Sequence, residues 1–533
     1  MKSKNIVYGK LPTAELPQRS LGKLLLESVV ATNRKHVAFI NENTGETLSY
    51  GELLDASCRL AQSLKTYGVT QNHIIAIASD NHVNNFIVVL AAFFAGIPIA
   101  FINPKFTEYE LHHILNIIAP HLLFSTTPYS DKFNNLKSRN SYLQEVVLID
   151  TNEITKFLNQ YSNKSGYTST FEAADVDIRN HLAIVLFSSG TTGLPKGVML
   201  THLNVIATLV YSLDCYNITK DQGDSLLPLP FFHTYGLHAT LLALLRKRKI
   251  ILLDRFDPEV YLRAIEKHKI SLLLTVPPII QFLLKNEAVN KYDLSSVRDI
   301  SCGAAPLTRS TEEAIKKKLN IKMIRQAFGM TELGCAMVTP ERIERLGSVG
   351  TLSPGLMCVI RDIESGENLG PRQRGEICVK GPTIMKGYYK NELATKETFT
   401  EDGWMKTGDI AYYDEDGYFY VVDRIKELIK YKGYQVAPTE LEQILLSNPK
   451  IQDAAIIGIP DEKAGELPLA FVVKEPSVIL NEKEVQDYLA KFVSKHKYLY
   501  GGVRFVDAIP RTPAGKVLRR QLKEMVSPVR SKL

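Results

Sequence analysis

The stretch Leu182–Gly197, LAIVLFSSGTTGLPKG, decides how this 533-residue chain is interpreted. It opens with an uninterrupted apolar run, Leu182–Phe187, which predicts a short β-strand buried on both faces. The following residues, Ser188–Gly197, are rich in serine, threonine and glycine and include one cation, Lys196. Glycine lets the backbone approach a ligand closely, and hydroxyl, backbone N–H and ammonium groups bind phosphate oxygens. The stretch therefore predicts a strand that leads into a phosphate-binding loop, although not a Walker A loop, because glycine follows the lysine.

The same arrangement of an apolar run and a glycine-containing loop occurs twice more. Val297–Cys302 leads to Gly303–Pro306, and Lys322–Gln326 leads to Ala327–Glu332. Because ligands of open α/β sheets bind beyond the carboxyl ends of the strands, we expect the three loops to converge on one site. Other apolar runs also predict parallel strands covered by helices on both faces: Ile74–Ala78, His121–Phe124, Val146–Ile149 and Ser271–Val276.

The organisation of the chain changes twice toward its C-terminus. After about residue 345, turns marked by glycine and proline separate short strands, which predicts a β-rich subdomain. Beyond Asp423-Arg424 a compact α+β pattern begins. We therefore predict a large α/β N-terminal domain over residues 1–422, with two parallel-type sheets between helices plus the β-rich subdomain, and a small α+β domain over residues 428–533.

The composition excludes several classes of function. The net charge of +7 is mild for this length and no long basic block carries it, so nucleic-acid binding is not expected. We interpret the short basic run Arg246–Lys249 as a solvated helix end. None of the six cysteines forms a CxxC pair, and no Cys/His cluster has the spacing of zinc ligands. The cysteines are therefore expected to be buried thiols.

Neither a membrane span nor a secretory signal is expected. Phe86–Ile102 is apolar but shorter than the roughly 20 residues that a spanning helix needs, so it predicts a buried helix followed by a strand. Met1–Gln18 has no apolar segment of the kind that directs secretion. The tripeptide Ser531-Lys532-Leu533 matches the peroxisomal address, so we expect a peroxisomal location and recognition by the peroxisomal import receptor.

Several motifs together identify a family. The loop after Leu182–Phe187 resembles the signature of adenylate-forming enzymes, the superfamily of acyl-CoA synthetases, 4-coumarate-CoA ligases and beetle luciferases. The resemblance covers nearly the whole chain, and residues 423–438 look most like the luciferase and coumarate-ligase branch. Further motifs follow in the family's order: Pro230–His233, Gly303–Leu307, Gln326–Glu332, Thr407–Asp409, Asp423–Pro438 and Pro513–Lys516.

The resemblance implies a two-step reaction, in which a carboxylic acid and ATP form an acyl-adenylate and the acyl group then passes to coenzyme A. It implies that Glu332 holds Mg²⁺, a cation that prefers carboxylate oxygen and usually bridges to substrate phosphates. Thr331 would contact the α-phosphate, Asp409 the ribose, and Phe328 would stack on adenine. The implied ATP- or AMP-binding residues are Ser188, Ser189, Gly190, Thr191, Thr192, Gly193, Lys196, Gly303, Ala304, Ala305, Gln326, Ala327, Phe328, Gly329, Thr331, Asp409, Arg424, Lys426 and Lys516.

The resemblance also implies that the small domain is mobile and rotates about a hinge at residues 423–427, where Lys426 lies. Lys516 would offset the charge where the carboxylate meets the α-phosphate. Lys430 would serve the second step, because one adenylate cannot face both lysines in a single arrangement. His233 would form a gate between the ATP site and the acyl pocket. Coenzyme A would contact Arg255, Lys432, Gly433 and Gln435.

By the same resemblance, the acyl pocket consists of His233, Tyr235, Ala239, Cys302, Ala327, Gly329 and Cys335. None of these can neutralise a second carboxylate, so a hydrophobic monocarboxylic acid is expected. The peroxisomal address favours a medium- or long-chain fatty acid, with an aromatic, coumarate-like acid as an alternative. A luciferase is an alternative, although luciferases tend to carry serine where this chain has Cys335. Two further candidates are a ligase that loads a carrier protein and a non-catalytic nucleotide-binding protein.

Overall fold

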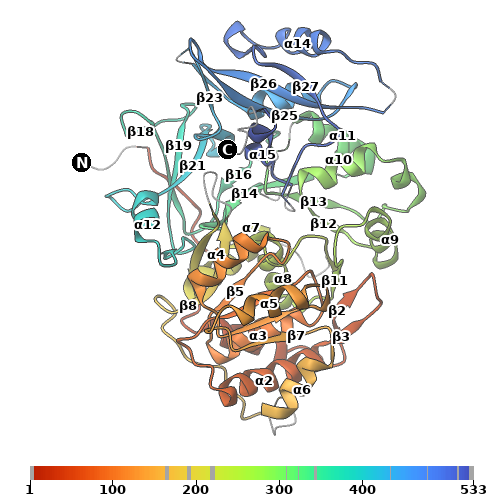
Figure 1. Ribbon diagram of the computed structural model, residues 1–533, viewed down its shortest axis with the longest axis vertical. Coiled ribbons are helices and arrows are strands. Elements are labelled where there is room, and N and C mark those ends of the chain that lie inside the picture. The colour runs from red at the N-terminus through yellow and green to blue at the C-terminus, as the bar shows by residue number, and fades with distance from the viewer. Residues whose placement is uncertain are drawn as a thin grey trace.

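The computed structural model describes residues 5–161, 167, 169–188, 194–216, 223–305, 307, 309–321, 323–340, 345–432, 434–476, 478–512 and 515–526. Within these ranges the strands form three sheets of 15, seven and five strands (Figure 1). The elements from β23 onward, drawn in blue, lie together at one end of the molecule (Figure 1). This arrangement confirms the predicted fold class.

The seven-stranded sheet contains the strand that precedes the phosphate-loop motif. In the order β8-β5-β4-β6-β7 the strands are parallel, and β9 and β20 extend the sheet in antiparallel fashion beside β8. The apolar runs of the sequence account for these strands, since nearly every residue of them is buried. The bounds are β4 (Ile75–Ala78), β5 (Ile99–Phe101), β6 (Leu122–Ser125), β7 (Glu145–Leu148), β8 (Leu182–Ser188), β9 (Lys196–Thr201) and β20 (Gly387–Tyr388).

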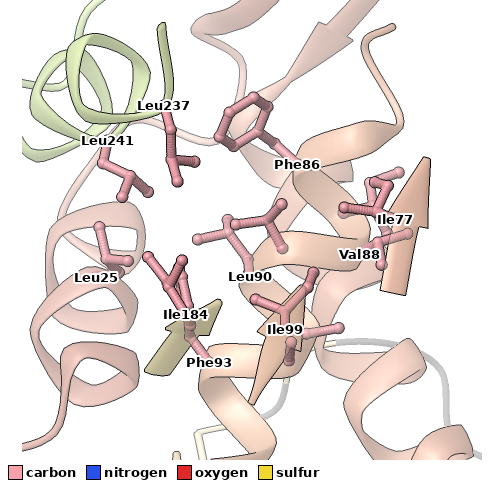
Figure 2. Close-up of a cluster of buried hydrophobic side chains, with 14 of the residues drawn as sticks. Leu25, Ile77, Phe86, Val88, Leu90, Phe93, Ile99, Ile184, Leu237 and Leu241 are labelled. Atoms are coloured by element: carbon pink, nitrogen blue, oxygen red, sulfur yellow. The ribbon is translucent and has the colours of Figure 1, made fainter. Parts of the chain in front are cut away.

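Apolar helices pack this sheet into the main core. Figure 2 shows Leu25 of α1 (Leu21–Val30) and Leu237 and Leu241 of α8 (Thr234–Leu245) around Leu90 of α3 (Asn85–Ala95). The helix α3 is the one expected within Phe86–Ile102. Helix α2 (Tyr50–Tyr67) begins at a capping box of Ser49 and Glu52 and ends at Gly68, whose φ of 101° favours glycine.

The 15-stranded sheet joins a parallel part to an antiparallel part through β14. Strands β2, β11, β10, β12, β13 and β14 run parallel, and the strands from β15 to β1 pair antiparallel. The antiparallel part is the predicted β-rich subdomain. The bounds are β1 (Val7–Tyr8), β2 (Val37–Asn41), β3 (Thr47–Ser49), β10 (Ser225–Leu227), β11 (Ile250–Leu252), β12 (Leu272–Thr275), β13 (Asp299–Cys302), β14 (Met323–Met330), β15 (Gly334–Val338), β16 (Gly350–Leu352), β17 (Met357–Arg361), β18 (Asn368–Leu369), β19 (Gly375–Lys380), β21 (Met405–Tyr413) and β22 (Tyr418–Arg424).

One predicted loop is a strand. Residues 327–330 were expected to leave the sheet after Gln326, but β14 continues to Met330 because this segment pairs antiparallel with β15. The pairing shifts register between Phe328 and Gly329. Gly329 has no room for a side chain, because a Cβ there would lie 2.2 Å from the carbonyl oxygen of Gly334. The residues of this segment therefore line the site as part of a strand and not as a loop.

The five-stranded sheet belongs to the C-terminal part of the chain. Its order is β24-β23-β26-β25, with β27 beside β26, and α13 and α14 pack on its apolar core. The boundary predicted at 422 falls within β22, two residues before its end, and the one predicted at 428 directly precedes β23. Both stay predictions. The bounds are β23 (Ile429–Tyr431), β24 (Tyr434–Val436), β25 (Ile451–Asp461), β26 (Gly465–Lys474), β27 (Gly502–Phe505), α13 (Pro438–Leu446), α14 (Glu482–Ala490) and α15 (Arg519–Glu524).

The other helices cover the two larger sheets. They are α4 (Glu108–Ile118), α5 (Ser130–Ser138), α6 (Asn152–Tyr161), α7 (His202–Tyr216), α9 (Pro258–His268), α10 (Pro277–Lys285), α11 (Arg309–Leu319) and α12 (Glu392–Thr398). Among the helices of the described ranges, none has the length and apolar character to span a membrane. The tripeptide Ser531-Lys532-Leu533 lies outside the described residues.

Candidate active site

Two cavities meet beyond the carboxyl ends of the parallel strands. The first, of about 750 Å³, lies between α10 and β14 on one side and α13 and β25 on the other, and is called the α13 cavity. The second, of about 640 Å³, runs along α8 and is called the α8 cavity. Six residues line both: Ala304, Ala327, Phe328, Gly329, Arg424 and Lys516. The described parts of the three predicted loops therefore converge, as expected.

Most of the predicted site residues line one or both cavities. In the α8 cavity these are Ser188, Lys196, His233, Tyr235, Ala239, Gly303, Ala304, Ala327, Phe328, Gly329, Thr331, Glu332, Cys335, Arg424, Lys426 and Lys516. In the α13 cavity they are Ala304, Ala305, Ala327, Phe328, Gly329, Asp409, Arg424 and Lys516. Six lie outside both linings: Arg255, Cys302, Gln326, Lys430, Lys432 and Gln435. Ser189, Gly190, Thr191, Thr192, Gly193 and Gly433 lie outside the described residues.

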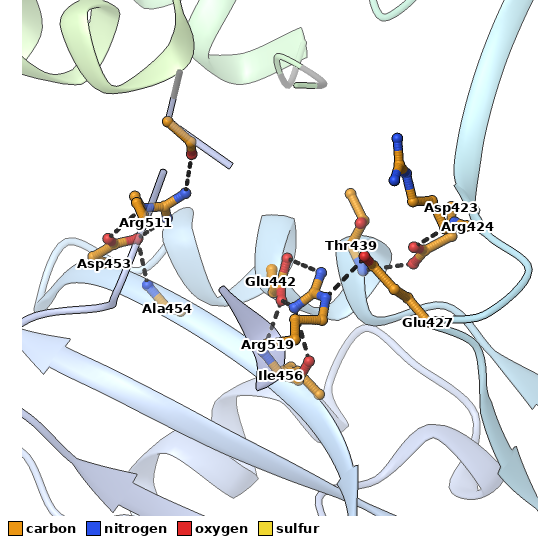
Figure 3. A network of polar contacts seen from close by, with 11 residues as sticks. Asp423, Arg424, Glu427, Thr439, Glu442, Asp453, Ala454, Ile456, Arg511 and Arg519 are labelled. Atoms are coloured by element: carbon orange, nitrogen blue, oxygen red, sulfur yellow. Dashed lines mark hydrogen bonds and ion pairs between the residues drawn. The ribbon is translucent and has the colours of Figure 1, made fainter. Parts of the chain in front are cut away.

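Lys516 reaches the meeting point of the cavities from a tight turn. The Lys516 N–H donates to the Thr512 hydroxyl at 3.1 Å, and the Thr512 N–H donates to the Lys516 carbonyl oxygen at 2.8 Å. Arg511 stabilises the turn, because its guanidinium binds Asp453 at 2.8 Å and donates to the Gly515 carbonyl oxygen at 2.9 Å (Figure 3). Gly515 has a φ of 83°, and a Cβ there would lie 2.8 Å from Pro278 of α10. The turn therefore packs directly against the N-terminal part of the chain.

A second contact joins the same two parts. The Lys285 ammonium at the end of α10 forms an ion pair with Glu475 at 2.6 Å and donates to the carbonyl oxygen of Ile451 at 3.3 Å. Both partners lie in the C-terminal sheet or directly after it. Together with the packing at Gly515, this contact holds the arrangement in which Lys516 faces Asp409 and Arg424.

Asp409 and Arg424 form a buried ion pair at the wall of the α13 cavity. They are cross-strand partners on β21 and β22, and Arg424 Nε lies 3.0 Å from Asp409 Oδ1. Burial raises the pKa of Asp409 to about 6, although Arg424 and Lys516 act in the opposite direction. Burial and the charge of Arg424 lower the pKa of Lys516, whereas Glu427 and Asp409 raise it. The site thus holds a carboxylate whose charge depends on pH near neutrality.

The rate at low ATP concentration should depend on the ionisation of Asp409. A protonated carboxyl group loses its attraction for Arg424 and one acceptor for a ribose hydroxyl. Because the pKa is raised to about 6, kcat/KM for ATP is expected to fall below that pH, approaching about tenfold per pH unit. Initial rates at subsaturating ATP between pH 5 and pH 8 measure this. A profile of Asp409→Asn that falls in the same way would assign the transition to another group.

A cluster of buried charges anchors the strand that carries Arg424. Arg519 binds Glu427 at 2.9 Å, forms an ion pair with Glu442 and donates to the Ile456 carbonyl oxygen at 2.9 Å (Figure 3). Asp423 accepts the N–H of Thr439 at 2.9 Å, which ties the end of β22 to the first turn of α13. These contacts set the position of Arg424 relative to the C-terminal sheet.

Glu332 is buried at the wall of the α8 cavity, with 5% of its surface exposed. Its Oε1 accepts a hydrogen bond from the Tyr388 hydroxyl at 2.9 Å. The Lys196 ammonium lies 5.0 Å from the centre of the Tyr388 ring. Tyr388 therefore contacts a cation through its ring and a carboxylate through its hydroxyl. Tyr388 was not predicted, because β20 is only two residues long and carries no sequence signal of its own.

The residues around Glu332 fit the predicted Mg²⁺. No group of three or more histidine, cysteine or acidic residues that could hold a metal occurs in the described part of the chain. Glu332 instead offers a single carboxylate, and Tyr388 occupies one side of Oε1 and fixes the group in place. Mg²⁺ is usually held by one or two carboxylates together with substrate phosphates. Glu332 is therefore the residue that would hold it.

His233 begins helix α8 at the N-cap position. Its Nε2 is buried and has no hydrogen-bond partner among the described residues. Burial lowers the pKa of His233 to about 4, so the imidazole is neutral at pH 7. A buried polar atom without a partner at a cavity wall suits contact with a ligand. Tyr235, two residues after His233, donates its hydroxyl to the Ser301 carbonyl oxygen at 3.2 Å.

Two predicted residues have structural contacts. Gln326 is 3% exposed, accepts the Leu307 N–H at 3.2 Å and donates to Glu312, so it secures the loop after β13 to β14. Cys302 ends β13 and is buried in the core beneath the same loop. Both lie outside the two cavity linings, so their predicted contacts with ligands stay predictions.

The residues predicted to contact coenzyme A lie on other surfaces. Lys430 and Gln435 are exposed cross-strand partners on the hairpin of β23 and β24, and Lys432 is exposed at its turn. Arg255 is exposed after β11. Of the two lysines predicted to be catalytic, Lys516 lines the cavities in the arrangement described and Lys430 does not.

The interpretation of Arg246–Lys249 as a solvated helix end is wrong for two of its residues. Arg246 and Arg248 are half-buried and line the α8 cavity, whereas Lys247 is exposed. The chain turns sharply at Lys247, whose φ is 58°. Because of this turn, Arg246 and Arg248 on either side of it both line the cavity. The sequence did not predict this turn, because residues other than glycine rarely adopt a positive φ.

Comparison with known proteins shows the family to which the chain belongs. The chain matches the AMP-binding enzyme family over residues 26–389 and the AMP-binding enzyme C-terminal domain over residues 440–516. It is 39% identical to luciferin 4-monooxygenase of Photuris pensylvanica, with 100% of each chain covered. It is 39% identical to 4-coumarate–CoA ligase-like 9 of Arabidopsis thaliana, over 95% of this chain and 90% of that protein. The crystal structure of ATP-bound MatB from Rhodopseudomonas palustris has a TM-score of 0.86 at 28% identity, covering 95% of this chain and 98% of that one. The chain therefore belongs to the AMP-binding, adenylate-forming enzyme superfamily.

Proposed function

We propose that this enzyme converts a carboxylic acid with an apolar body, such as a medium- or long-chain fatty acid, to its acyl-adenylate and then to its coenzyme A thioester. One observation carries the proposal: two cavities large enough for separate ligands meet at Lys516. The α13 cavity offers Asp409 and Arg424, and the α8 cavity offers Glu332, His233 and a largely apolar passage. Two substrates bound there would present their reacting ends to the same ammonium group.

In the first step, a carboxylate oxygen of the acid bonds to the α-phosphorus of ATP. The bond from that phosphorus to the pyrophosphate oxygen breaks, and pyrophosphate leaves. Lys516 offsets the approach of two anions, Thr331 donates to the α-phosphate, and Asp409 accepts from the ribose. Phe328 stacks on adenine beside the Gly303–Ala305 loop. Mg²⁺, held by Glu332, would neutralise charge on the phosphates.

In the second step, the thiol of coenzyme A attacks the acyl carbon. The bond from this carbon to the phosphate oxygen breaks, AMP leaves, and the thiol proton passes to solvent. Lys430, Lys432, Gln435 and Arg255 serve this step by binding coenzyme A or the adenylate. Because Lys430 lies outside the cavities, the step requires the C-terminal part to rotate at residues 423–427, which breaks the Lys285–Glu475 pair.

A luciferin monooxygenase is the second candidate, since a luciferin 4-monooxygenase is among the most similar relatives. Both activities use the same adenylation step, so the cavities suit either. Cys335 lines the α8 cavity at the position where luciferases tend to carry serine, which favours the ligase. Oxygen-dependent light from luciferin and ATP would favour the luciferase. A peroxisomal location, from Ser531-Lys532-Leu533, is part of the proposal.

The proposal is tested by two assays on the same panel of fatty, cinnamic and luciferin-like acids. ATP–pyrophosphate exchange measures adenylation, and coenzyme A-dependent release of AMP measures thioester formation. We expect both activities with at least one fatty acid. Exchange without transfer to free coenzyme A would favour a carrier-protein ligase or a luciferase. No exchange with any acid would favour a non-catalytic nucleotide-binding protein.

A further inference from the structure

The wall of the α8 cavity changes from apolar to polar along helix α8. The helix has two faces with different surroundings. On one face, Leu237, Leu241 and Leu244 are fully buried in the core. Side chains on the other face, at intervals of three or four residues, line the cavity: Tyr235, His238, Ala239, Leu242 and Arg246. The cavity therefore follows the helix from His233 at one end to Arg246 at the other.

Two arginines form the remote end of this cavity. Arg246 and Arg248 both line it, on either side of the sharp turn at Lys247. The backbone fixes this turn, because the Arg248 N–H donates to the Ala243 carbonyl oxygen at 3.0 Å and the Arg248 carbonyl oxygen accepts the Tyr50 hydroxyl at 2.8 Å. The backbone that carries the two arginines is therefore fixed, and their half-buried side chains line the cavity.

The two lysines of the run, Lys247 and Lys249, do not line the cavity. The Lys247 ammonium is exposed and donates to the Ala31 carbonyl oxygen at 3.3 Å. The Lys249 ammonium forms an ion pair with Asp224 at 2.7 Å. Arg246 and Arg248 also take part in interactions within the protein. Each guanidinium has five N–H donors, so it can bind a carboxylate while it keeps contacts within the protein.

His238 adds a polar atom to the cavity wall, on α8 between Tyr235 and the apolar Ala239 and Leu242. Its Nδ1 lies 3.2 Å from the Thr234 hydroxyl, and its Nε2 is buried with no partner within the described ranges. A buried polar atom of this kind is costly unless a ligand or water satisfies it. The imidazole is neutral at pH 7, because burial lowers its pKa to about 4. It can therefore contact a polar ligand without adding charge.

We infer that the acid substrate carries a second carboxylate, which Arg246 and Arg248 bind at the remote end of the α8 cavity. The inference rests on the proposed function, and it replaces a simple fatty acid with a dicarboxylic acid that has an apolar middle. Arginine suits this task, since its planar N–H groups match the two oxygens of a carboxylate. The apolar side chains of Ala239 and Leu242 face the middle of such a molecule.

The length of helix α8 sets the expected distance between the two carboxylates of the substrate. Helix α8 has 12 residues, which corresponds to about 18 Å. A long side chain at the end of a helix leans back toward its start, so a carboxylate bound by Arg246, the C-cap of α8, would lie on the order of 12 to 15 Å from the reacting carboxylate. This distance requires an extended, medium-chain dicarboxylic acid.

The test compares dodecanoic acid with dodecanedioic acid, which differ only in the terminal carboxylate. The ratio of their kcat/KM values for pyrophosphate release, diacid over monoacid, is measured above neutral pH, where both carboxyl groups are ionised. We expect a ratio above one for the wild type. In Arg246→Met and Arg248→Met the ratio should fall by about tenfold to a hundredfold. Arg246→Lys should recover part of it, because it restores the charge.

Lys247→Met is the matched control, since it removes one positive charge from the same turn at an exposed position. Its ratio should equal that of the wild type. An equal fall in Lys247→Met, or a wild-type ratio below one with efficient use of dodecanoic acid, would overturn the inference alone. The absence of pyrophosphate release with every acid would overturn the proposed function as well. Thermal unfolding of each variant with and without ATP shows that the fold and the nucleotide site are intact.

Discussion

Replacing Lys516 with alanine is expected to lower ATP–pyrophosphate exchange by about a hundredfold to a thousandfold, the effect of losing one well-placed charge at a reacting centre. The physical reason is the position of this ammonium, which lines both cavities beside the Asp409–Arg424 pair. No other lysine lines both cavities in the described part of the chain. Single-turnover measurements of acyl-adenylate formation separate this step from binding and release.

The second half-reaction provides the contrast. When chemically prepared acyl-adenylate is supplied, Lys516→Ala should form the thioester far better than it forms the adenylate. Lys430→Ala should show the reverse, because Lys430 is exposed on the β23–β24 hairpin outside both cavities. Two variants with equal losses in both half-reactions would contradict the rotation of the C-terminal part.

Replacing Glu332 with glutamine is expected to lower adenylate formation by about a hundredfold or more, the order of several kcal/mol that charge stabilisation by a metal ion supplies. Glutamine keeps the size of the side chain and an oxygen that can accept the Tyr388 hydroxyl, so the change isolates the negative charge. The dependence of the rate on Mg²⁺ concentration should move to much higher concentrations. Initial rates over a magnesium titration at fixed ATP measure both effects.

Tyr388→Phe is the matched control for this experiment. It removes the hydrogen bond to Glu332 but leaves the carboxylate and the ring near Lys196. We expect a loss of about tenfold, the value of one hydrogen bond to a charged group, with little change in the magnesium titration. If Glu332→Gln kept the wild-type magnesium dependence, Glu332 would not be the metal ligand.

Helix α8 shows where prediction from sequence succeeded and where it stopped. The residues Tyr235 and Ala239 were placed in the acyl pocket through the resemblance, and both line the cavity. The helix is apolar on nearly all sides, so periodicity cannot tell which face meets the core and which meets a ligand. The role of Arg246 therefore stayed hidden, and the basic run was interpreted as a solvated end.

The strand at residues 323–330 illustrates the same limit. Its apolar start was recognised, but the continuation through Ala327–Met330 depends on pairing with β15. A segment of alanine, phenylalanine and glycine after a buried strand is compatible with a loop and also with a strand at the edge of a sheet. The partner strand decides between the two, and the pairing also placed Gln326 beneath the site.

Features that act over a few neighbouring residues were readable from the order of amino acids. The capping box at Ser49, the buried runs of the parallel strands and the family motifs are of this kind, since each depends on side chains close together in the chain. Contacts between distant segments settled the remainder. Tyr388 meets Glu332 across 56 positions, and Lys516 approaches Asp409 only because its turn packs on Pro278. Such contacts depend on how sheets and helices pack in three dimensions, which no local pattern of hydrophobic and polar residues encodes.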